Sequence, residues 1–406
     1  NVLPSEGRSN LALQYNDAVY CGQYSQDGQL FCVATQGFQV NVFGVDAFSG
    51  LHHQATLAAR IGRWTLTDLD ITSDNRFVVF SSITSILQIG RTDGSGRIEM
   101  FKLDPSPVSF GGGLVSLSEF GVWSVRFADN GQILVAGTNS HMVYVYDVAT
   151  RTVLDVIDAH DDDVNALCLP GPSKNIVCSG SDDGLIKVWP GLLRRREFRN
   201  CNFRDLRKRG NQPKPVGVFC GHTEGVTYLT AKEHGDQYIA SNGKDQKLKL
   251  WDMRKLRSSE DHDTTTCVEY RLEWDYRWEK YPSDPNFIQC PHDDSVMTMM
   301  GHSVGNTLIR CRFSPALTGG QYIYSGSSDG TVYIYNLLGD LVKTLQPNEK
   351  LWAELNEHGH IGDVCPVVRD VSWHPYLPVM MASYFTNNQY NRGGVIRYDC
   401  SDGASP

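Results

Sequence analysis

Short runs of apolar residues alternate with polar positions along most of the chain, and Gly, Asn or Asp separates one run from the next. Residues 143–146 (VYVY) and 332–335 (VYIY) are typical, because β-branched and aromatic side chains favour extended strands. The three- and four-residue spacing of an amphipathic helix is nearly absent. The pattern therefore predicts an all-β chain of many short strands.

Two stretches of the chain repeat the same order of residues. The first leads from His160 through two apolar runs to Trp189, and the second leads from His222 to Trp251. In both, the histidine precedes the tryptophan by 29 residues and an aspartate precedes it by six. Internal repetition of this kind indicates a repeat architecture. We predict seven copies of the unit, of which the less regular ones occupy residues 19–43, 66–89, 122–147, 302–335 and 360–399.

These units resemble the WD-repeat family, in which Gly-His stands near the start of a repeat and Trp-Asp ends its third strand. Gly221-His222 and Trp251-Asp252 match both positions. The resemblance implies a seven-bladed β-propeller with four antiparallel strands in each blade. We expect an N-terminal segment at 1–18, the propeller at 19–400 and a tail at 401–406, with insertions at about 91–120, 190–215 and 253–300.

Composition narrows the class of partner. The formal net charge of −9 disfavours a nucleic-acid backbone as the main ligand. The chain also contains no run of about 18 apolar residues of the kind that spans a membrane. The 11 cysteines include no CxxC pair, and Cys290 with His292 lacks partners at zinc-finger spacing. We therefore expect no metal, no cofactor, no membrane contact and no direct binding of nucleic acid. Irregular cysteines in apolar runs favour a reducing compartment, the cytoplasm or the nucleus.

The combination of His, Ser and Asp suggests an acyl-transfer triad. The WD-repeat resemblance implies instead that these residues form a hydrogen-bonded tetrad within a blade, with the aspartate orienting the histidine. A catalytic triad occurs once in a chain, whereas this set occurs twice, so we expect a structural role and no enzymatic activity. The two sets are His160, Ser179, Asp183 and Trp189, and His222, Ser241, Asp245 and Trp251.

The end of the second clear repeat, Trp251-Asp252-Met253-Arg254, resembles the box shared by WD-repeat substrate receptors of cullin-4 ubiquitin ligases. The resemblance implies that Arg254 projects from the bottom of the propeller into the adaptor damaged-DNA-binding protein 1, with Asp245 completing the box. A guanidinium suits this role, because its planar fork pairs with acceptors on a partner. The alternative is an exposed arginine on a turn.

Several irregular stretches are similar to one branch of these receptors, the cullin-4-associated factor 11-like proteins, also called WD-repeat protein 23. They are residues 20–25, 160–166, 214–217, 274–278 (WDYRW), 307–315 and 368–375. The resemblance implies a substrate-recognition subunit that directs target proteins to proteasomal degradation in the nucleus and cytoplasm. The alternative is a scaffold of another nuclear or cytoplasmic complex without a ligase role.

Two insertions carry further hypotheses. Residues 274–278 could form a binding element, but two tryptophans in an insertion more often pack against the side of a propeller. The basic run at 194–209 could be a nuclear import signal or an RNA contact, although a solvated loop is the preferred interpretation.

In a propeller of this kind, the loops at the mouth of the central pore are the surface that would bind a target protein. Arg369, Arg310 and Lys244 would suit acidic side chains there, so we expect an acidic degron peptide as the target. The alternative is a mouth that is polar only because it is solvated. By motif position the mouth comprises Tyr20, Thr67, Trp123, Asn165, Thr227, Ile309 and Arg369, then Gln36, Thr84, Asn139, Asp182, Lys244, Ser328 and Asn387, with Arg310 beside them.

Overall fold

The structure is a computed structural model of the 406-residue chain. It describes residues 3–46, 50–103, 120–171, 175–190, 213–233, 237–258, 274–282, 289–348, 351, 366–386 and 392–400. Four sequence hypotheses lie outside the described residues, namely those that concern His360, Asn387, the basic run at 194–209 and the tail at 401–406.

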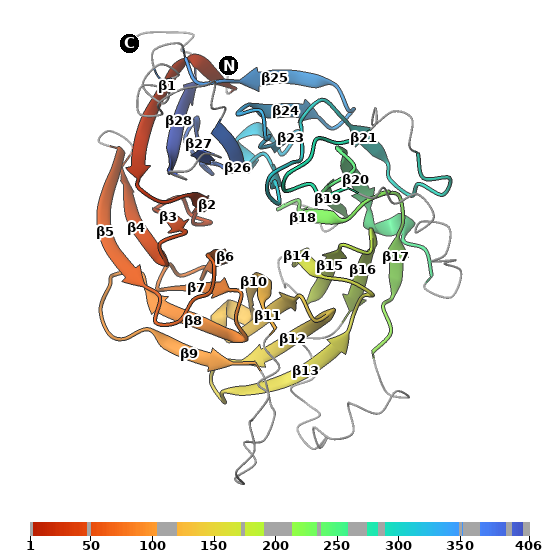
Figure 1. The fold of residues 1–406 in the computed structure, drawn as a ribbon, viewed down its shortest axis with the longest axis horizontal. Helices are drawn as coiled ribbons and strands as arrows, with labels where there is room; N and C mark the ends of the chain where they lie inside the picture. The colour runs from red at the N-terminus through yellow and green to blue at the C-terminus, as the bar shows by residue number, and fades with distance from the viewer. Residues whose placement is uncertain are drawn as a thin grey trace.

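Seven four-stranded antiparallel sheets surround a central axis (Figure 1). The predicted seven-bladed β-propeller is therefore confirmed. Each sheet is one blade, and its first-named strand lies innermost. Blades 1 to 3 consist of β2 (Val19–Tyr24), β3 (Leu30–Thr35), β4 (Gln39–Asp46) and β5 (Gly50–Ala58); β6 (Leu66–Ile71), β7 (Phe77–Ser82), β8 (Ile86–Arg91) and β9 (Glu99–Lys102); and β10 (Val122–Ala128), β11 (Ile133–Thr138), β12 (Met142–Asp147) and β13 (Thr152–Asp158).

The other four blades follow the same order. Blade 4 is β14 (Val164–Cys168), β15 (Ile176–Ser181), β16 (Ile186–Pro190) and β17 (Gly217–Phe219), and blade 5 is β18 (Val226–Ala231), β19 (Tyr238–Gly243), β20 (Leu248–Asp252) and β21 (Met297–Met299). Blade 6 is β22 (Cys311–Phe313), β23 (Tyr322–Ser325), β24 (Val332–Asn336) and β25 (Leu341–Leu345), and blade 7 is β26 (Pro366–Trp373), β27 (Val379–Thr386), β28 (Gly393–Cys400) and β1 (Pro4–Tyr15). Short 3-10 turns occur at Asp129–Gly131, Met253–Lys255 and Ala316–Thr318.

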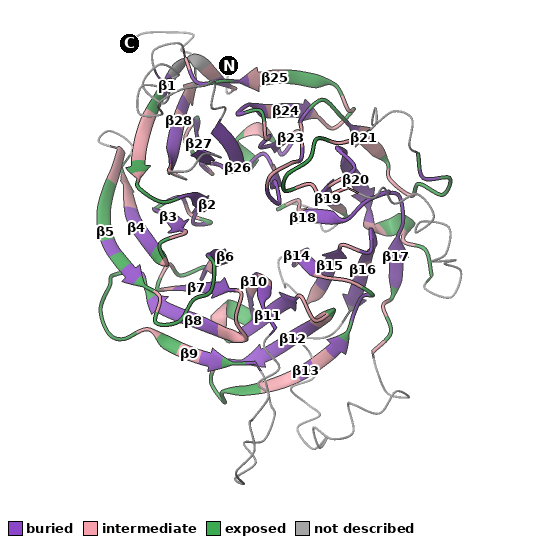
Figure 2. Ribbon diagram, in the orientation of Figure 1, coloured by how far each residue is buried: buried purple, intermediate pink, exposed green. Residues whose placement is uncertain are grey.

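The hydrophobic core lies between neighbouring blades. One cluster joins Val143 and Val145 of blade 3 to Leu167 and Trp189 of blade 4, and comparable clusters fill the other interfaces. Inner strands are covered on both faces, so β3 is buried along its whole length, whereas most residues of the outer strand β5 are exposed or half-buried. Figure 2 shows this change from buried strands near the axis to exposed segments at the rim.

The two ends of the chain close the ring. β1 pairs with β28, with Leu13 opposite Val395 and Tyr15 opposite Gly393, so the first strand of the chain is the outer strand of blade 7. The expectation of a separate N-terminal segment at 1–18 is therefore wrong for residues 4–15. Ring closure removes the open sheet edges that two unjoined terminal blades would present.

Two of the expected insertions contain blade strands. The range 91–120 includes β9, and the range 253–300 includes β21. Strand β9 has four residues and is separated from the next blade by a long segment. Strand β21 has three residues and is separated from the preceding strand, β20, by a long segment. Among the described residues, no helix is long and apolar enough to cross a membrane.

Candidate functional site

Each blade turns back on itself at two opposite ends, because consecutive strands are antiparallel. We call the end with the turns between first and second strands and between third and fourth strands the bottom face. The end with the turns between second and third strands, and with the links between blades, is the top face. Arg254, just after β20, therefore lies on the bottom face, and Lys244, between β19 and β20, lies on the top face.

The top face is hollowed by a cavity of about 1000 Å³. Its lining comes from blades around the whole ring and from the links between them, so the cavity lies at the mouth of the central channel. Five of the positions that the sequence predicted at the mouth line it: Tyr20, Trp123, Asn165, Lys244 and Arg369. Of the other predicted mouth positions, Gln36, Thr67 and Asp182 do so as well.

Arg310, Thr227, Asn139 and Ser328 are not among the lining residues. The side chains of the last three make hydrogen bonds within the chain: Thr227 Oγ1 donates to the Ile309 carbonyl at 2.9 Å, Asn139 Oδ1 accepts from the Gly121 amide at 2.7 Å, and Ser328 Oγ donates to Ser303 Oγ at 2.9 Å. Ile309 itself is fully buried, so it is not at the mouth either.

Arg310 lies in a buried ionic network beneath the cavity. Its guanidinium contacts Asp68 Oδ1 at 2.8 Å and Asp370 Oδ2 at 3.2 Å, and the side chain is 3% exposed. Arg126 pairs with the same Asp68, and Arg312 pairs with Asp370 at 3.1 Å. The expectation that Arg310 binds acidic side chains of a target is therefore corrected, because this cation is already paired with two carboxylates of the chain.

The network joins five blades. Asp68 is on β6, Arg126 on β10 and Asp370 on β26, while Arg310 directly precedes β22 and Arg312 lies on it. The ring of Tyr228, on β18, lies 4.9 Å from the Arg310 guanidinium carbon. Burial alone would raise the pKa of Asp68, but the Arg126 and Arg310 guanidinium groups lower it to about 2. The Asp68 carboxylate therefore remains ionised at neutral pH and paired with both guanidinium groups.

Arg369 forms part of the cavity floor. Nε donates to Thr307 Oγ1 at 3.1 Å, and Nη1 donates to the Tyr20 carbonyl and to Cys21 Sγ at 3.3 Å. The guanidinium also lies over the Tyr20 ring, 5.5 Å from its centroid. Within the described part of the chain, Arg369 has no carboxylate partner and Nη2 has no acceptor. A nearly buried cation thus keeps one donor group for a ligand.

The Trp-Asp-Tyr-Arg-Trp insertion forms one wall of the cavity. The Tyr276 carbonyl accepts a hydrogen bond from the Asn306 amide at 2.7 Å, and the Tyr276 ring lies 4.3 Å from Lys244 Nζ. Trp278 is 80% exposed. The expectation that this insertion packs against the side of the propeller is wrong. The insertion begins beside Arg254 on the bottom face and reaches the top mouth.

The neighbouring part of the wall, at blade 4, carries the carboxylates Asp163 and Asp182. Trp123 Nε1 donates to Asp163 Oδ2 at 3.0 Å, and Asn165 Nδ2 donates to Asp182 Oδ1 at 2.7 Å. Lys244 Nζ lies 2.7 Å from the same Asp182 oxygen. Burial raises the pKa of Asp163, and repulsion from Asp182 and Asp162 adds to the effect. The Trp123 hydrogen bond and attraction from Lys244 oppose it.

Some lining residues were not predicted from the sequence. Trp64 is 56% exposed and lies with its ring 5.9 Å from that of Tyr20, and Phe385 lies 5.1 Å from Tyr20 on another side. Asp163 belongs to the Asp161–163 run, and an acidic run at the link before a blade was the available signal. Trp64 lies in the link between blades 1 and 2, and Phe385 lies near the end of β27, and neither position belongs to the repeat motif.

The two histidine sets occupy the interiors of blades 4 and 5. His160 bonds to Asp183 Oδ2 through Nδ1 and to Ser179 Oγ through Nε2, both at 2.7 Å, and Trp189 Nε1 donates to the same Ser179 oxygen at 2.8 Å. Burial would raise the pKa of Asp183, but the neighbouring His160 lowers it to about 2. The structure thus brings together all four residues of this set.

The second set has the same bonds. His222 bonds to Asp245 at 3.0 Å and to Ser241 Oγ at 2.7 Å, while Trp251 Nε1 donates to Ser241 Oγ at 2.8 Å. Both histidine side chains are 0% exposed, so no substrate reaches either serine. The geometry stabilises the blades.

Arg254 on the bottom face has a fixed orientation. Nε donates to Asp252 Oδ1 at 2.9 Å and Nη2 donates to Asp252 Oδ2 at 2.7 Å, while Nη2 also reaches the Tyr238 hydroxyl at 3.2 Å. The hydrogen bonds from Arg254 lower the pKa of Asp252. The Arg254 side chain is still 58% exposed, so the guanidinium faces solvent in a pre-organised geometry.

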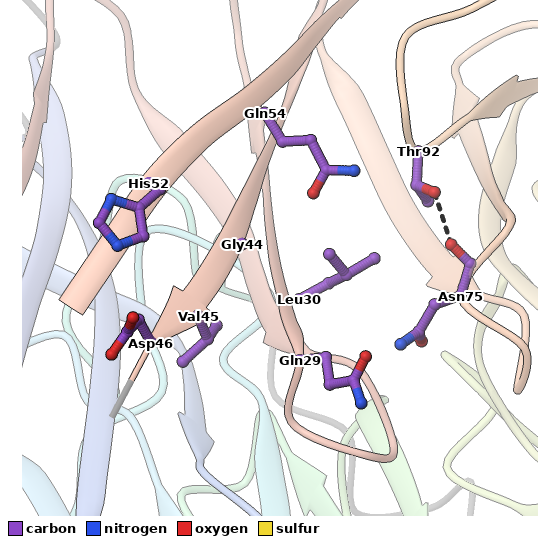
Figure 3. Close-up of a pocket in the computed structure, with 9 residues that line it drawn as sticks. All are labelled: Gln29, Leu30, Gly44, Val45, Asp46, His52, Gln54, Asn75 and Thr92. Atoms are coloured by element: carbon purple, nitrogen blue, oxygen red, sulfur yellow. Dashed lines mark hydrogen bonds between the residues drawn. The ribbon is translucent and has the colours of Figure 1, made fainter. Parts of the chain in front are cut away.

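A second cavity of about 530 Å³ lies on the bottom face between blades 1 and 2. Figure 3 shows its polar lining, in which Gln29, Gln54 and Asn75 surround the space and Thr92 Oγ1 donates to the Asn75 carbonyl. None of the residues predicted to bind a partner lines this cavity.

Comparison with known proteins identifies the repeats. The family described as "WD domain, G-beta repeat" matches residues 114–147, 151–190, 213–252 and 293–336. The LEC14B protein of Lithospermum erythrorhizon is 38% identical over 92% of this chain and 72% of its own length. The LEC14B homolog of Prunus armeniaca is 37% identical over 91% of this chain and 71% of its own length.

A further relative carries a name that states its associations. The "DDB1- and CUL4-associated factor 11 homolog" of Caenorhabditis elegans is 30% identical over 94% of this chain, and this match spans 63% of that relative's length. Identity at this level over nearly the whole chain confirms the resemblance found from the irregular stretches of sequence.

Proposed function

Because the chain belongs to the WD-repeat family of the LEC14B proteins and the DDB1- and CUL4-associated factor 11 homologs, we propose that it is a substrate-recognition subunit of a cullin-4 ubiquitin ligase. The adaptor, damaged-DNA-binding protein 1, would bind the bottom face and a target protein would bind the top face. The observation that carries the proposal is Arg254, exposed on the bottom face and held in place by Asp252.

The geometry of Arg254 suits a protein interface. Immobilising a flexible arginine side chain on binding costs conformational entropy, and Asp252 and Tyr238 already restrict this side chain in the free protein. Arginine is also enriched among residues that dominate binding energy. The Nη1 group makes no hydrogen bond within the described part of the chain, so it remains available to an acceptor on the adaptor.

The top cavity suits a peptide segment of a target. Aromatic side chains from several blades line it, which is the composition of a site that buries a few anchoring residues. Arg369 supplies an unpaired donor for a carboxylate, so the acidic degron expected from the sequence would contact Arg369 and not Arg310. The protein would present its target to the ligase and catalyse no reaction itself.

A nuclear and cytoplasmic location is part of the same proposal. The proposal rests on the location that the family resemblance implies, because six described cysteines are free and buried but Cys220 is disulfide-bonded. Imaging of a fluorescent fusion tests this. An exclusively secreted or organellar signal would contradict it.

Co-purification with damaged-DNA-binding protein 1 tests the proposal. Wild type should retain the adaptor and Arg254→Ala should lose it. Arg277→Ala is the matched control, because Arg277 contacts Asp275 two residues earlier with the same pattern of bonds, is 61% exposed and lies on the top face. If wild type retains no adaptor, the scaffold alternative gains support.

A further inference from the structure

We propose that the top cavity selects a target segment with two opposite charges, a carboxylate that pairs with Arg369 and a Lys or Arg side chain that pairs with Asp163. This inference rests on the proposed function, in which the top face binds the target. It specifies the chemistry of that target, and it differs from the expectation of a purely acidic peptide because it adds a basic residue.

Among the described residues, Arg369 and Asp163 are the two charged groups of the cavity that form no ion pair, and Asp163 is subject only to a weaker attraction from Lys244. Arg369 Nη2 has no acceptor there. Asp163 accepts a hydrogen bond from Trp123 on Oδ2, while Oδ1 has no donor among the described residues. Each group therefore lines the cavity with one hydrogen-bonding position that no described residue uses.

The other charges at the mouth are already compensated. Lys244 pairs with Asp182 at 2.7 Å, and Arg277 pairs with Asp275 at 2.6 Å. Beneath the floor, Arg310 is paired with two carboxylates. A ligand that bound these groups would have to displace an existing ion pair. A ligand that bound Arg369 and Asp163 would not.

The two uncompensated groups lie on opposite sides of the mouth. Arg369 is on β26 in blade 7, and Asp163 immediately precedes β14 in blade 4. Three steps is the largest separation that a closed ring of seven blades allows. Figure 1 shows β26 and β14 across the central opening from each other. One ligand must span the mouth to reach both groups.

The surface between the two charges is aromatic. Trp64, Trp123 and Phe385 line the cavity together with Tyr20, and Trp278 of the insertion stands exposed at its edge. A volume of about 1000 Å³ lies at the upper end of the range for ligand pockets, roughly 300–1,000 Å³. The segment should therefore place apolar or aromatic residues between its acidic and basic ends.

The two opposite charges of the cavity would determine the chain direction of the bound segment as well as its sequence. A segment that enters reversed would place its carboxylate against Asp163 and its cation against Arg369, and like charges brought together in this way oppose binding. The cavity would thus select both the sequence and the chain direction of the target.

The test begins with a display library of random 12-residue peptides panned against the full chain. The proposal expects an enriched consensus with one acidic and one basic position at a fixed spacing and apolar residues between them. An enriched peptide is then labelled with fluorescein and titrated by anisotropy. Asp163→Asn and Arg369→Gln should each weaken binding at least about tenfold.

Peptides that lack either the basic or the acidic residue show which charge of the peptide each cavity residue contacts. Asp163→Asn should have no effect on a peptide whose basic residue is replaced by Gln, and Arg369→Gln should have none on a peptide whose acidic residue is replaced. The amide oxygen introduced by Asp163→Asn can still accept the Trp123 hydrogen bond, which limits disturbance of the fold. The controls Arg91→Gln and Asp93→Asn change the same charges at an exposed pair outside the cavity, and thermal unfolding followed by circular dichroism reports that every variant is folded.

The outcomes separate the two levels of the account. A consensus with acidic residues alone, bound equally by wild type and Asp163→Asn, would overturn this inference and leave the proposed function intact. If no peptide is enriched, or if both cavity variants bind every enriched peptide as wild type does, the top cavity is not the target site. The target-binding half of the proposed function would then fail together with the inference.

Discussion

Arg310 Nη2 and Asp68 Oδ1 lie 2.8 Å apart within the channel, although 242 residues separate them along the chain. Asp68 belongs to blade 2 and Arg310 to blade 6, so this pair joins blades on opposite sides of the ring. Removing one member of a buried ion pair leaves the other charge without compensation.

Arg310→Ala should therefore lower the free energy of unfolding by about 3–5 kcal/mol. Arg91→Ala removes an exposed arginine from its pair with Asp93 and should lower the free energy of unfolding far less, because solvent screens an exposed ion pair. Urea unfolding of the two variants and wild type measures both changes. Similar small losses in the two variants would show that the channel network does not hold the blades together.

The tetrads predict a stability effect without a catalytic one. Ser179→Ala leaves the Trp189 indole and the His160 ring without their shared partner, so we expect a loss of roughly 1–3 kcal/mol. Ser95, which is exposed, provides the control substitution. Thermal unfolding of both variants gives the comparison. An unchanged unfolding midpoint for Ser179→Ala would contradict the proposal that the tetrad stabilises the blade.

His302 predicts a dependence of stability on pH. Burial lowers the pKa of His302 to about 4, below its ordinary value of 6.5. The unfolded chain therefore binds a proton that the folded chain does not, and stability present above pH 6.5 is lost as the pH falls toward 4. Each pH unit in this window costs about 1.4 kcal/mol, so the loss between pH 7.5 and 5 is about 2 kcal/mol.

His302→Gln should remove that contribution, since glutamine does not titrate. Urea unfolding at pH 7.5 and pH 5 shows whether wild type loses more stability than the variant over the same interval. Equal losses would mean that other groups account for the pH dependence.

Closure by β1 predicts the effect of a truncation. Deleting residues 1–15 exposes the edge of β28 in blade 7, and an unpaired strand edge favours association with other chains. We expect a lower melting temperature and self-association by size-exclusion chromatography, both reversed by adding a peptide of residues 1–15. A truncated chain that stays monomeric with an unchanged melting temperature would contradict this view of the closure.

The repeat allowed the seven blades to be predicted because each repeat unit encodes local structure. The closure could not be predicted in the same way. Residues 4–15 carry no Gly-His or Trp-Asp signal, and their position depends on pairing with β28 nearly 400 residues later. The outer strands β9 and β21 were missed because long insertions precede or follow them.

The cavity was predicted in part for a similar reason. Motif position placed Arg369, Trp123 and Lys244 at the mouth, because each blade offers the same positions to the top face. Arg310 precedes β22 directly and lies below the mouth, where it pairs with carboxylates of blades 2 and 7. The wall at 274–278 follows the path of an insertion, which no local pattern determines.

The most direct test of the proposed receptor is a titration of purified damaged-DNA-binding protein 1 against the immobilised chain. Wild type and Arg277→Ala should bind with equal affinity, whereas Arg254→Ala should bind at least about tenfold more weakly, since arginine is enriched among the interface residues whose truncation weakens binding most. Equal binding by Arg254→Ala and wild type, or no binding by wild type, would contradict the account.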